Sequence, residues 1–553
     1  MTIATVPVLI VGSGPAGLTA AALLADHGVP SLLVERNPST TDHPRAHVVN
    51  TRTMEIFRGL GIADAVHARG LAPEAYERIL WKRTIAGAEL GALEMNLARV
   101  AERVEASPTR IASCAQDHVE ALLRDAAEHR GCELRYETEL VGYAQDDTGV
   151  TATLRSSGTE TRVRAQYVIA ADGASSPTRR LLDVGMTGIP PLATLTGIYF
   201  EADLAPWIRD RPGLLYFVMN AQAPGIMIAL DGRRRWIFHV LAPEGGLSVD
   251  AAAIAVRLAV GIPDLALTIK SIRPWTMTAE VAEHFRVGRV FLAGDAAHRF
   301  PPTGGFGLNT GVQDAHNLAW KLARVIAGTA TEALLESYEA ERKPVAQSNT
   351  DWSVRNFLEA GTAVGPGNLM ATMQLEAGGP DVPAILAQLQ RDIDGERDHF
   401  DALGQDLGFV YEKGALVPDG TELPPVTDRA AEYVPNARPG SRAPHCWLWR
   451  GAERISTLDL FGKDFVLLVP DTATAWIAAA PTVATHGVTL HRIGPRGDWR
   501  DDDGVWQARY GLGPDGAVLV RPDGHVAWRS HGTSAQAASV LRGALDAGLG
   551  VGA

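Results

Sequence analysis

The feature that most constrains this chain is a glycine-rich turn near its N-terminus, Gly12-Ser13-Gly14-Pro15-Ala16-Gly17. Residues 6–11 before it are apolar and rich in β-branched side chains, which is typical of a buried parallel strand. Residues 18–26 after it are rich in Ala and Leu, which favours a helix, and a second apolar run at 31–34 ends in Glu35. Strand, glycine turn, helix, strand and acid is the order that binds the pyrophosphate and ribose of a dinucleotide. We therefore predict a dinucleotide-binding α/β unit, and at this point both NAD(P) and FAD remain open.

Length, charge and cysteine usage exclude several classes of protein. The chain has 553 residues, 46% hydrophobic and 21% charged, which suits a globular protein of roughly three domains. Its net charge of −13 argues against nucleic-acid binding. Three widely spaced cysteines indicate neither a disulfide framework nor a metal site, and no apolar run of about 20 residues predicts a transmembrane helix. We expect a cytoplasmic protein that binds no membrane.

Two further motifs decide the kind of dinucleotide. Residues 172–179, DGASSPTR, fit D-G-x-x-S-x-x-R directly after an apolar strand. Gly294-Asp295 follows a second such strand and leads into a Pro/Gly-rich loop at 300–307 and a helix predicted from about Thr310 to Ile326. In order and spacing, these motifs and the glycine turn resemble the class A flavin-dependent aromatic hydroxylases, the family of para-hydroxybenzoate hydroxylase and phenol hydroxylase. The resemblance covers residues 5–375.

The resemblance implies FAD as the cofactor and assigns its contacts to matching positions. It places the ADP part of FAD on the glycine turn and the acid after the second strand, with an arginine near the pyrophosphate. It also implies that a glutamine contacts the cofactor and that a glycine loop wraps the isoalloxazine. The implied cofactor-binding residues are Gly12, Gly14, Pro15, Ala16, Gly17, Glu35, Arg36, Arg45, Gln116, Asp172, Asp295, Pro302, Gly305, Gly307, Leu308 and Asn309. Asp172 has a second interpretation as a cap of the turn that follows it.

The predicted fold class is α/β, with a Rossmann-type FAD-binding domain formed by residues 1–180 and 280–375. Probable strands between 194 and 241 predict an inserted antiparallel-sheet substrate domain at 181–279, with part of 76–112. The rise in Gly and Pro at 360–382 predicts a loop.

The last part of the chain, 395–553, is predicted to be a separate C-terminal domain. Residues 517–529, AVLVRPDGHVAWR, resemble the thioredoxin-like C-terminal domain of the phenol hydroxylase branch. The chain has no C-x-x-C motif, since Cys446 stands alone, so we interpret this domain as structural. It suggests a homodimer.

The resemblance also implies a reaction. NAD(P)H, as a transient reductant, reduces FAD; O₂ then gives a flavin C4a-hydroperoxide that hydroxylates a phenolic or polycyclic aromatic substrate. Between NADPH and NADH the family more often uses NADPH, and we favour a polyketide-type substrate. No catalytic side chain is assigned, because the flavin does the chemistry. Aromatic, Met and His residues of the middle sheet are the candidate pocket lining: Tyr199, Tyr216, Met219, Met227, Trp236 and His239.

Four alternatives stay open or are set aside. A Baeyer–Villiger oxygenase or a phenol-catabolic hydroxylase would share this scaffold. A flavin disulfide reductase would need a redox cysteine pair near the first helix, and none is present. A non-catalytic flavin-binding scaffold is the remote fourth. His43, His47 and His298 are interpreted as structural polar residues and no metal site is expected.

Overall fold

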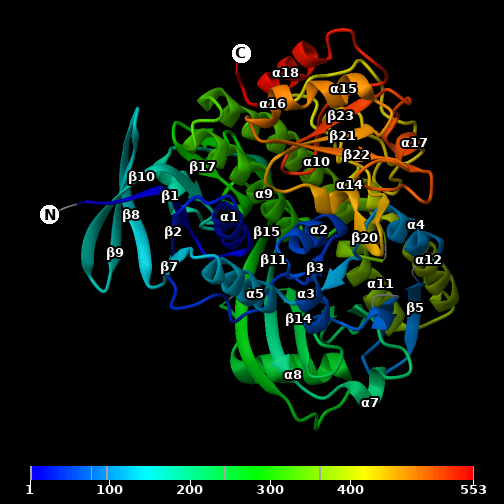
Figure 1. Ribbon diagram of the computed structural model, residues 1–553. Helices are drawn as coiled ribbons and strands as arrows, with labels where there is room; N and C mark the ends of the chain where they lie inside the picture. Colours follow the sequence, from blue (N-terminus) through cyan, green and yellow to red (C-terminus); the bar gives the residue numbers. More distant parts are fainter. Residues whose placement is uncertain are drawn as a thin grey trace.

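The structure is a computed structural model that describes residues 3–75, 78–94, 97–241, 245–359, 361 and 363–551 (Figure 1). Residues 76, 77, 95 and 96 of the segment assigned to the substrate domain lie outside the described residues. Two large sheets and a smaller third one organise the chain.

The first sheet is built around the glycine turn and has the strand order β16-β17-β10-β1-β2-β7, with β9 on β10 and β8 on β9. Strand β1 (Ala4–Val11) is parallel to β2 (Ser31–Val34) and to β10 (Thr159–Ala170), and α1 (Pro15–Asp26) connects β1 to β2. The predicted strand, turn, helix and strand are therefore confirmed. The remaining strands are β7 (Glu133–Arg135), β8 (Thr138–Asp146), β9 (Gly149–Ser156), β16 (Arg286–Val287) and β17 (Val290–Leu292).

Helices α1, α5 (Gln116–His129) and α9 (Phe306–Ile326) pack together against this sheet. Helix α9 begins four residues before the predicted start, since Gly305 in the left-handed region begins it directly after the loop. Other helices of the chain are α2 (Thr51–Gly59), α3 (Ala63–Arg69), α4 (Leu97–Ala106), α6 (Pro177–Leu181), α10 (Ser337–Glu359), α13 (Arg397–Phe400) and α14 (Leu403–Leu407).

The second sheet is mainly antiparallel and has the order β18-β15-β11-β14-β13-β12-β4-β5. Helix α8 (Val249–Val260) covers one of its faces (Figure 1), where it shares a buried core with the sheet. The strands are β4 (Arg78–Lys82), β5 (Glu89–Glu94), β11 (Met186–Glu201), β12 (Leu215–Val218), β13 (Gly225–Ala229), β14 (Arg235–Leu241), β15 (Thr268–Ala282) and β18 (His298–Arg299). The short α7 (Ala205–Ile208) follows β11, and β3 (Val48–Val49) pairs with β6 (Ala112–Ser113) outside both sheets.

The loop predicted at 360–382 is wrong, because most of it is α11 (Gly365–Ala377), followed by α12 (Val382–Gly395). Pro366 lies in the first turn of α11, where a proline is compatible with a helix, and Gly378 ends it with φ 70°. Leu375 of α11 and Ile393 of α12 share a core with Phe217 of β12. Tertiary packing thus forms this helix in spite of its flanking Gly and Pro.

The third sheet belongs to the C-terminal part and has the order β22-β21-β23-β24. Strand β21 is parallel to β22 and antiparallel to β23, and helices pack on the sheet, as expected from the thioredoxin-like resemblance. Its elements are β21 (Phe465–Pro470), α15 (Thr474–Ala479), α16 (Pro481–Ala484), β22 (Val488–Ile493), α17 (Trp506–Tyr510), β23 (Ala517–Val520), β24 (Val526–Ser530) and α18 (Ala537–Gly548), preceded by the hairpin β19 (Trp447–Arg450) and β20 (Glu453–Ser456).

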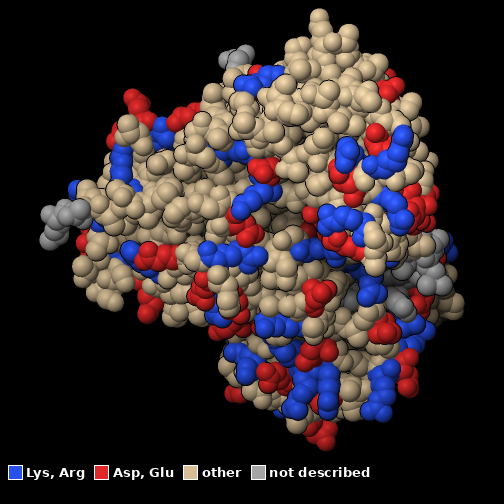
Figure 2. Space-filling view, viewed as in Figure 1, with Lys and Arg blue, Asp and Glu red and all other residues tan. Residues whose placement is uncertain are grey.

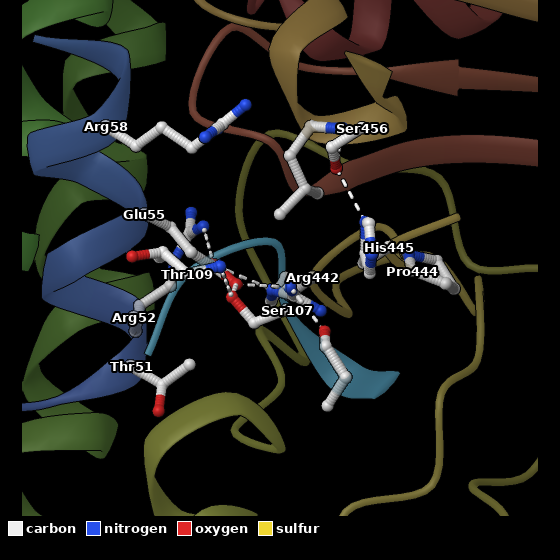
Figure 3. A network of polar contacts seen from close by, with 12 residues as sticks. Thr51, Arg52, Glu55, Arg58, Ser107, Thr109, Arg442, Pro444, His445 and Ser456 are labelled. Atoms are coloured by element: carbon white, nitrogen blue, oxygen red, sulfur yellow. Dashed lines mark hydrogen bonds and ion pairs between the residues drawn. The ribbon is translucent and has the colours of Figure 1, made fainter. Parts of the chain in front are cut away.

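A buried carboxylate on α2 joins the first sheet's unit to the segment before β19 (Figure 3). Glu55 accepts hydrogen bonds from both Arg442 nitrogens that face it, from Arg52 Nη1 at 2.9 Å and from Ser107 Oγ at 2.7 Å. Arg442 also donates to Ala106 O at 3.0 Å. Since Glu55 and Arg442 are both buried, each neutralises a charge that would otherwise be costly to bury.

A second buried carboxylate, Glu341 on α10, makes a similar connection to the third sheet. Arg521, at the end of β23, donates to both of its oxygens at 2.7 and 2.8 Å, and Lys321 Nζ lies 2.7 Å away. Asn317 Nδ2 and the backbone N–H of Ala415 donate to it as well, at 2.6 and 2.8 Å. Two charged groups and two neutral donors, from three parts of the chain, therefore depend on one carboxylate.

On the face in Figure 2, acidic and basic side chains are interleaved over the lower part, whereas uncharged residues predominate at the top, over the C-terminal part. Within the described residues, no helix is both long and apolar enough to cross a membrane.

Candidate functional site

A cavity of about 1970 Å³ lies between the two large sheets. Its walls include the N-termini of α1 and α9 on one side, and strands β11 to β15 with part of α11 on the other. Pockets for one drug-sized ligand usually occupy about 300–1,000 Å³. The cavity therefore has room for a dinucleotide and for a second molecule beside it.

The glycine turn forms one end of this cavity, and its three glycines have different roles. A Cβ on Gly12 would lie 2.3 Å from Ala171 O, and one on Gly17 would lie 2.0 Å from Gly12 O. Both positions must be glycine because a side chain there would collide with the protein's own backbone. Gly17 does not line the cavity. A Cβ on Gly14 would meet no atom within 4 Å, so this glycine borders open space. No side chain caps the N-terminus of α1, which leaves N–H groups available to a pyrophosphate and fits the implied cofactor.

Glu35, at the end of β2, is held in place on the cavity wall. Its carboxylate accepts hydrogen bonds from Ser13 N at 2.9 Å, Asn37 N at 2.8 Å and Asn37 Nδ2 at 2.6 Å. Arg36 beside it is exposed and also lines the cavity. A fixed carboxylate at this position can accept hydrogen bonds from ribose hydroxyls.

The segment 36–48 forms a second wall, and α5 supports it. Gln116 lines the cavity and donates to Glu120 Oε1 at 2.7 Å, and Glu120 Oε2 accepts from Thr41 N at 2.8 Å. Burial raises the pKa of Glu120 to about 6. Arg45 lines the cavity and makes no hydrogen bond or ion pair within the described residues. Sequence reasoning missed Glu120 as a site residue, although its i, i+4 spacing from Gln116 was the available signal.

Asp295 follows β17 on a short 3₁₀ turn and projects into the cavity, where its side chain is exposed. The surrounding cavity walls reduce the solvation of its carboxylate and raise its pKa, although His298, Arg45 and Arg299 act in the opposite direction. Its carboxyl has no hydrogen-bond partner within the described residues, so it is available to a ligand.

His298 does not share that availability. It contacts Asp314 Oδ2 at 2.7 Å in the buried core behind the turn, and Asp314 also accepts from Gly294 N at 3.1 Å. The structure thus agrees with the structural interpretation of His298, which helps to hold the turn that presents Asp295.

The loop before α9 reaches the cavity through Pro302, Gly305, Gly307 and Leu308. Gly305 has φ 69°, and a Cβ on Gly307 would meet no atom within 4 Å. The N-terminus of α9 has no side-chain cap, so a second set of N–H groups faces the site.

The assignment of Asn309 to the cavity surface needs correction. Its side chain is buried, donates to Val48 O at 3.0 Å and to Gly305 O at 2.6 Å, and accepts from Asn50 N at 2.9 Å. All of its side-chain atoms that can form hydrogen bonds are thus occupied within the protein. Asn309 braces the loop instead of touching a ligand with its side chain.

Asp172 lines the cavity, but its carboxylate is already used by the turn that follows it. Oδ1 accepts from Ser176 Oγ at 2.5 Å and Oδ2 accepts from Thr178 N at 2.9 Å. The geometry therefore favours the capping interpretation of Asp172.

The second sheet has a cavity face and a core face, and most predicted pocket residues are not on the cavity surface. Tyr216, Met227 and Trp236 lie in the core beneath α8, because successive side chains of a strand point to opposite faces. Met219 and Tyr199 are buried in other apolar clusters. These five assignments are therefore corrected, and His239 is the member of the set that lines the cavity.

The neighbours of the misassigned residues form the actual wall. Leu215 and Phe217 on β12, and Ile226 and Ile228 on β13, line the cavity. Trp275 and Arg273 on β15, with Val364, Leu369 and Phe357 from the α10–α11 region, complete it. The wall is thus predominantly apolar, as suits an aromatic ligand.

Three histidines, His43, His47 and His239, also line the cavity. Burial lowers the pKa of His43 and of His47 to about 4, and that of His239 to about 3. Each ring is therefore neutral near pH 7. Within the described residues, no group of three or more His, Cys, Asp or Glu side chains is arranged to hold a metal ion.

Comparisons with known proteins agree with this geometry. Residues 5–353 match the family model of an FAD binding domain, and residues 436–551 match that of the C-terminal part of aromatic-ring hydroxylases. A protein of Streptomyces halstedii described as a polyketide hydroxylase is 38% identical over 96% of this chain and 94% of its own. The 2,4-dichlorophenol 6-monooxygenase of Cupriavidus pinatubonensis is 34% identical over 98% of this chain and 96% of its own.

A solved structure gives the same result in three dimensions. The crystal structure of the flavin-dependent monooxygenase PieE, in complex with FAD and substrate, superimposes with a TM-score of 0.91 at 35% identity. The match covers 99% of both chains.

Proposed function

Because this chain belongs to the FAD-dependent aromatic-ring hydroxylases, we propose that it hydroxylates a polycyclic, polyketide-type phenol at the expense of NADPH or NADH. The protein is a flavoprotein aromatic monooxygenase with FAD as its cofactor. The observation that carries the proposed substrate class is the size and apolar lining of the cavity beyond the glycine-turn end. A simple phenol would leave much of that space to water.

We propose that Gly14 and the α1 N-terminus hold the FAD pyrophosphate, that Glu35 accepts from the adenosine ribose, and that Arg45, Gln116 and Asp295 make the further polar contacts. Arg36, Pro15 and Ala16 would contribute to the same wall, with Pro302, Gly305, Gly307 and Leu308 beside the ring system. When bound, FAD supplies the electron transfer and oxygen activation that no side chain can provide.

The chain's own residues would bind and orient the cofactor and the substrate, and would exclude water from the site. Phe217, Ile226 and Ile228 would pack on an aromatic ring, which keeps water from the reacting atoms. Arg45 and the helix N-termini would neutralise the phosphates, while Asp295 and Glu35 would accept from hydroxyls. NAD(P)H would bind transiently as a reductant.

We keep two structural expectations as proposals. The division into 1–180 with 280–375, 181–279 with part of 76–112, and 395–553 is supported by the membership of the three sheets. A homodimer is the proposed assembly, which sedimentation of the purified protein would test.

The test of the proposed function is oxidation of NADPH and NADH by the FAD-loaded protein, with phenol and 1,8-dihydroxyanthraquinone as probes. Product mass and hydrogen peroxide are recorded together. Stimulated oxidation with a product heavier by one oxygen supports hydroxylation, and the product structure separates it from Baeyer–Villiger insertion. Retention of FAD without stimulation by any aromatic compound would favour a scaffold.

The substrate size can be tested on its own with Ile226→Trp. This residue is half-buried on the cavity face, so the larger ring would project into the substrate half. We expect kcat/KM for the anthraquinone to fall at least about 10-fold more than that for phenol, since added volume excludes the larger ring system first. Met227→Leu, one residue along on the core face, is the control. This volume-conserving change should leave kcat/KM for both substrates unaltered. An equal loss for both substrates would contradict a polycyclic pocket.

A further inference from the structure

The histidines of the cavity wall are each fixed through Nδ1. The partners are Trp275 Nε1 for His239 at 3.3 Å, Ser271 Oγ for His43 at 2.7 Å and Ser113 Oγ for His47 at 3.1 Å. None of these bonds involves Nε2. Each ring therefore has one nitrogen that is held and one that is free to meet a ligand.

His239 differs from the other two in that its partner can only donate. A serine hydroxyl can donate or accept, but an indole N–H has no acceptor capacity. His239 Nδ1 must therefore accept from Trp275, and the single proton of the neutral ring must be on Nε2. That N–H makes no hydrogen bond within the described residues and is not closed off from solvent. The tautomer is thus set by a neighbouring residue, and it presents a donor.

The surroundings of His239 give this one N–H donor a large influence on which ligands bind. The cross-strand neighbour of His239 on β13 is Ile226, and Leu241 follows on the same face of β14, so the wall is apolar on that side and along the strand. On its other side, a Cβ on Gly197 would lie 3.2 Å from His239 Cε1 and 3.3 Å from His43 Nε2, which places the two rings side by side. A polar group within such a wall selects ligands that can satisfy it.

We propose that His239 Nε2–H donates a hydrogen bond to a carbonyl or hydroxyl oxygen of the aromatic substrate, and that Trp275 positions this donor. The inference rests on the proposed function and adds a specificity to it: the site takes aromatics that carry an oxygen in preference to the bare hydrocarbon. His239 binds the substrate, whereas Trp275 is a positioning residue that acts through His239.

The test is a binding measurement on the FAD-loaded protein, without reductant, followed by the change in flavin absorbance. The probes are 1-tetralone, an aromatic ketone whose oxygen only accepts, and tetralin, the same skeleton without the oxygen. His239→Leu should raise the Kd for 1-tetralone about 10-fold or more and leave that for tetralin unchanged, since a hydrogen bond is lost but apolar contact is kept. His239→Gln, whose amide N–H can replace Nε2–H, should stay within about 3-fold of the wild type.

Trp275→Phe tests the positioning role separately. The substitution keeps an aromatic ring but removes the N–H, so His239 is free to carry its proton on Nδ1. The Kd for 1-tetralone should rise about 3-fold, and combining this change with His239→Leu should add nothing further. A purely structural role would instead weaken both probes in every variant.

Three outcomes would overturn the inference: equal losses for both probes, a Gln variant as weak as the Leu variant, or no preference of the wild type for the ketone. None of them touches the proposed function, which fails separately if the wild-type protein retains no FAD or no aromatic stimulates NAD(P)H oxidation.

Discussion

Glu341→Gln should lower the stability of the whole protein by about 3–5 kcal/mol, because it leaves Lys321 buried without its counter-charge and Arg521 paired with Asp523 alone. The glutamine keeps the shape of the side chain, so the loss measures charge and not volume. Thermal unfolding followed by flavin fluorescence and by circular dichroism should show a midpoint lower by about 3–4 °C. Glu359→Gln, on the same helix but exposed, is the matched control and should change stability by less than about 0.5 kcal/mol.

The difference in stability between the wild type and Glu341→Gln should depend on pH. Burial alone would raise the pKa of Glu341, but Arg521 and Lys321 outweigh it and lower the pKa to about 2 from an ordinary value of 4.5. A carboxyl with a depressed pKa contributes stability above pH 4.5 and loses it as the pH falls towards 2. The difference between wild type and Glu341→Gln should therefore shrink by about 1 kcal/mol between pH 7 and pH 4. A constant difference would mean that Glu341 does not act through its charge.

Gly14→Val should abolish FAD binding while leaving the apoprotein folded. A Cβ at this position meets no protein atom within 4 Å, and its backbone φ of −73° suits any residue, so the apoprotein has no reason to change. The added side chain would instead fill the space next to the α1 N-terminus, where we place the pyrophosphate. We expect the affinity for FAD to fall about 100-fold or more, which equilibrium dialysis of the deflavinated protein would measure.

Gly17→Val is the matched comparison, since it makes the same substitution three residues later. Its Cβ would lie 2.0 Å from Gly12 O, so the apoprotein itself should be destabilised. If Gly14→Val retained FAD, or if both variants lost stability equally in the apo form, the placement of the pyrophosphate would be wrong.

The first sheet was predictable because its sequence signal is local. The apolar run before Gly12, the glycine turn and the acid at Glu35 lie within 30 residues, and each has one favoured conformation. The same holds for the strands of the third sheet, each of which is a short run rich in β-branched and apolar residues.

The substrate wall was not predictable, because both faces of β12 and β13 are apolar. Tyr216 and Phe217 are adjacent and both aromatic, yet one packs under α8 and the other lines the cavity. Alternation separates the two sets but cannot tell which set faces the cavity, since a core and an aromatic pocket take the same residues. The correct choice requires knowing where α8 packs, and that is a contact between distant segments.

The errors at α11 and Asn309 have related causes. Local Gly and Pro content predicted a loop, whereas the packing of Leu375 against the sheet stabilises a helix. Asn309 was assigned as a cofactor-binding residue of the loop, but its side chain faces inward, towards Val48 and Asn50. The position of the motif in the sequence correctly predicted which loop borders the cavity. The direction of each side chain is known only from the structure.

The two buried carboxylates, Glu55 and Glu341, have a consequence for folding during synthesis. A ribosome releases Glu55 nearly 400 residues before Arg442, and Glu341 180 residues before Arg521. Until those arginines emerge, Glu55 has only Arg52 and Glu341 has only Lys321 as a charged partner, so the earlier segments lack part of the charge that their final burial requires. The earlier segments should therefore complete their folding only when about the last fifth of the chain has been synthesised. A product truncated ahead of that point should be bound by chaperones or degraded by proteases.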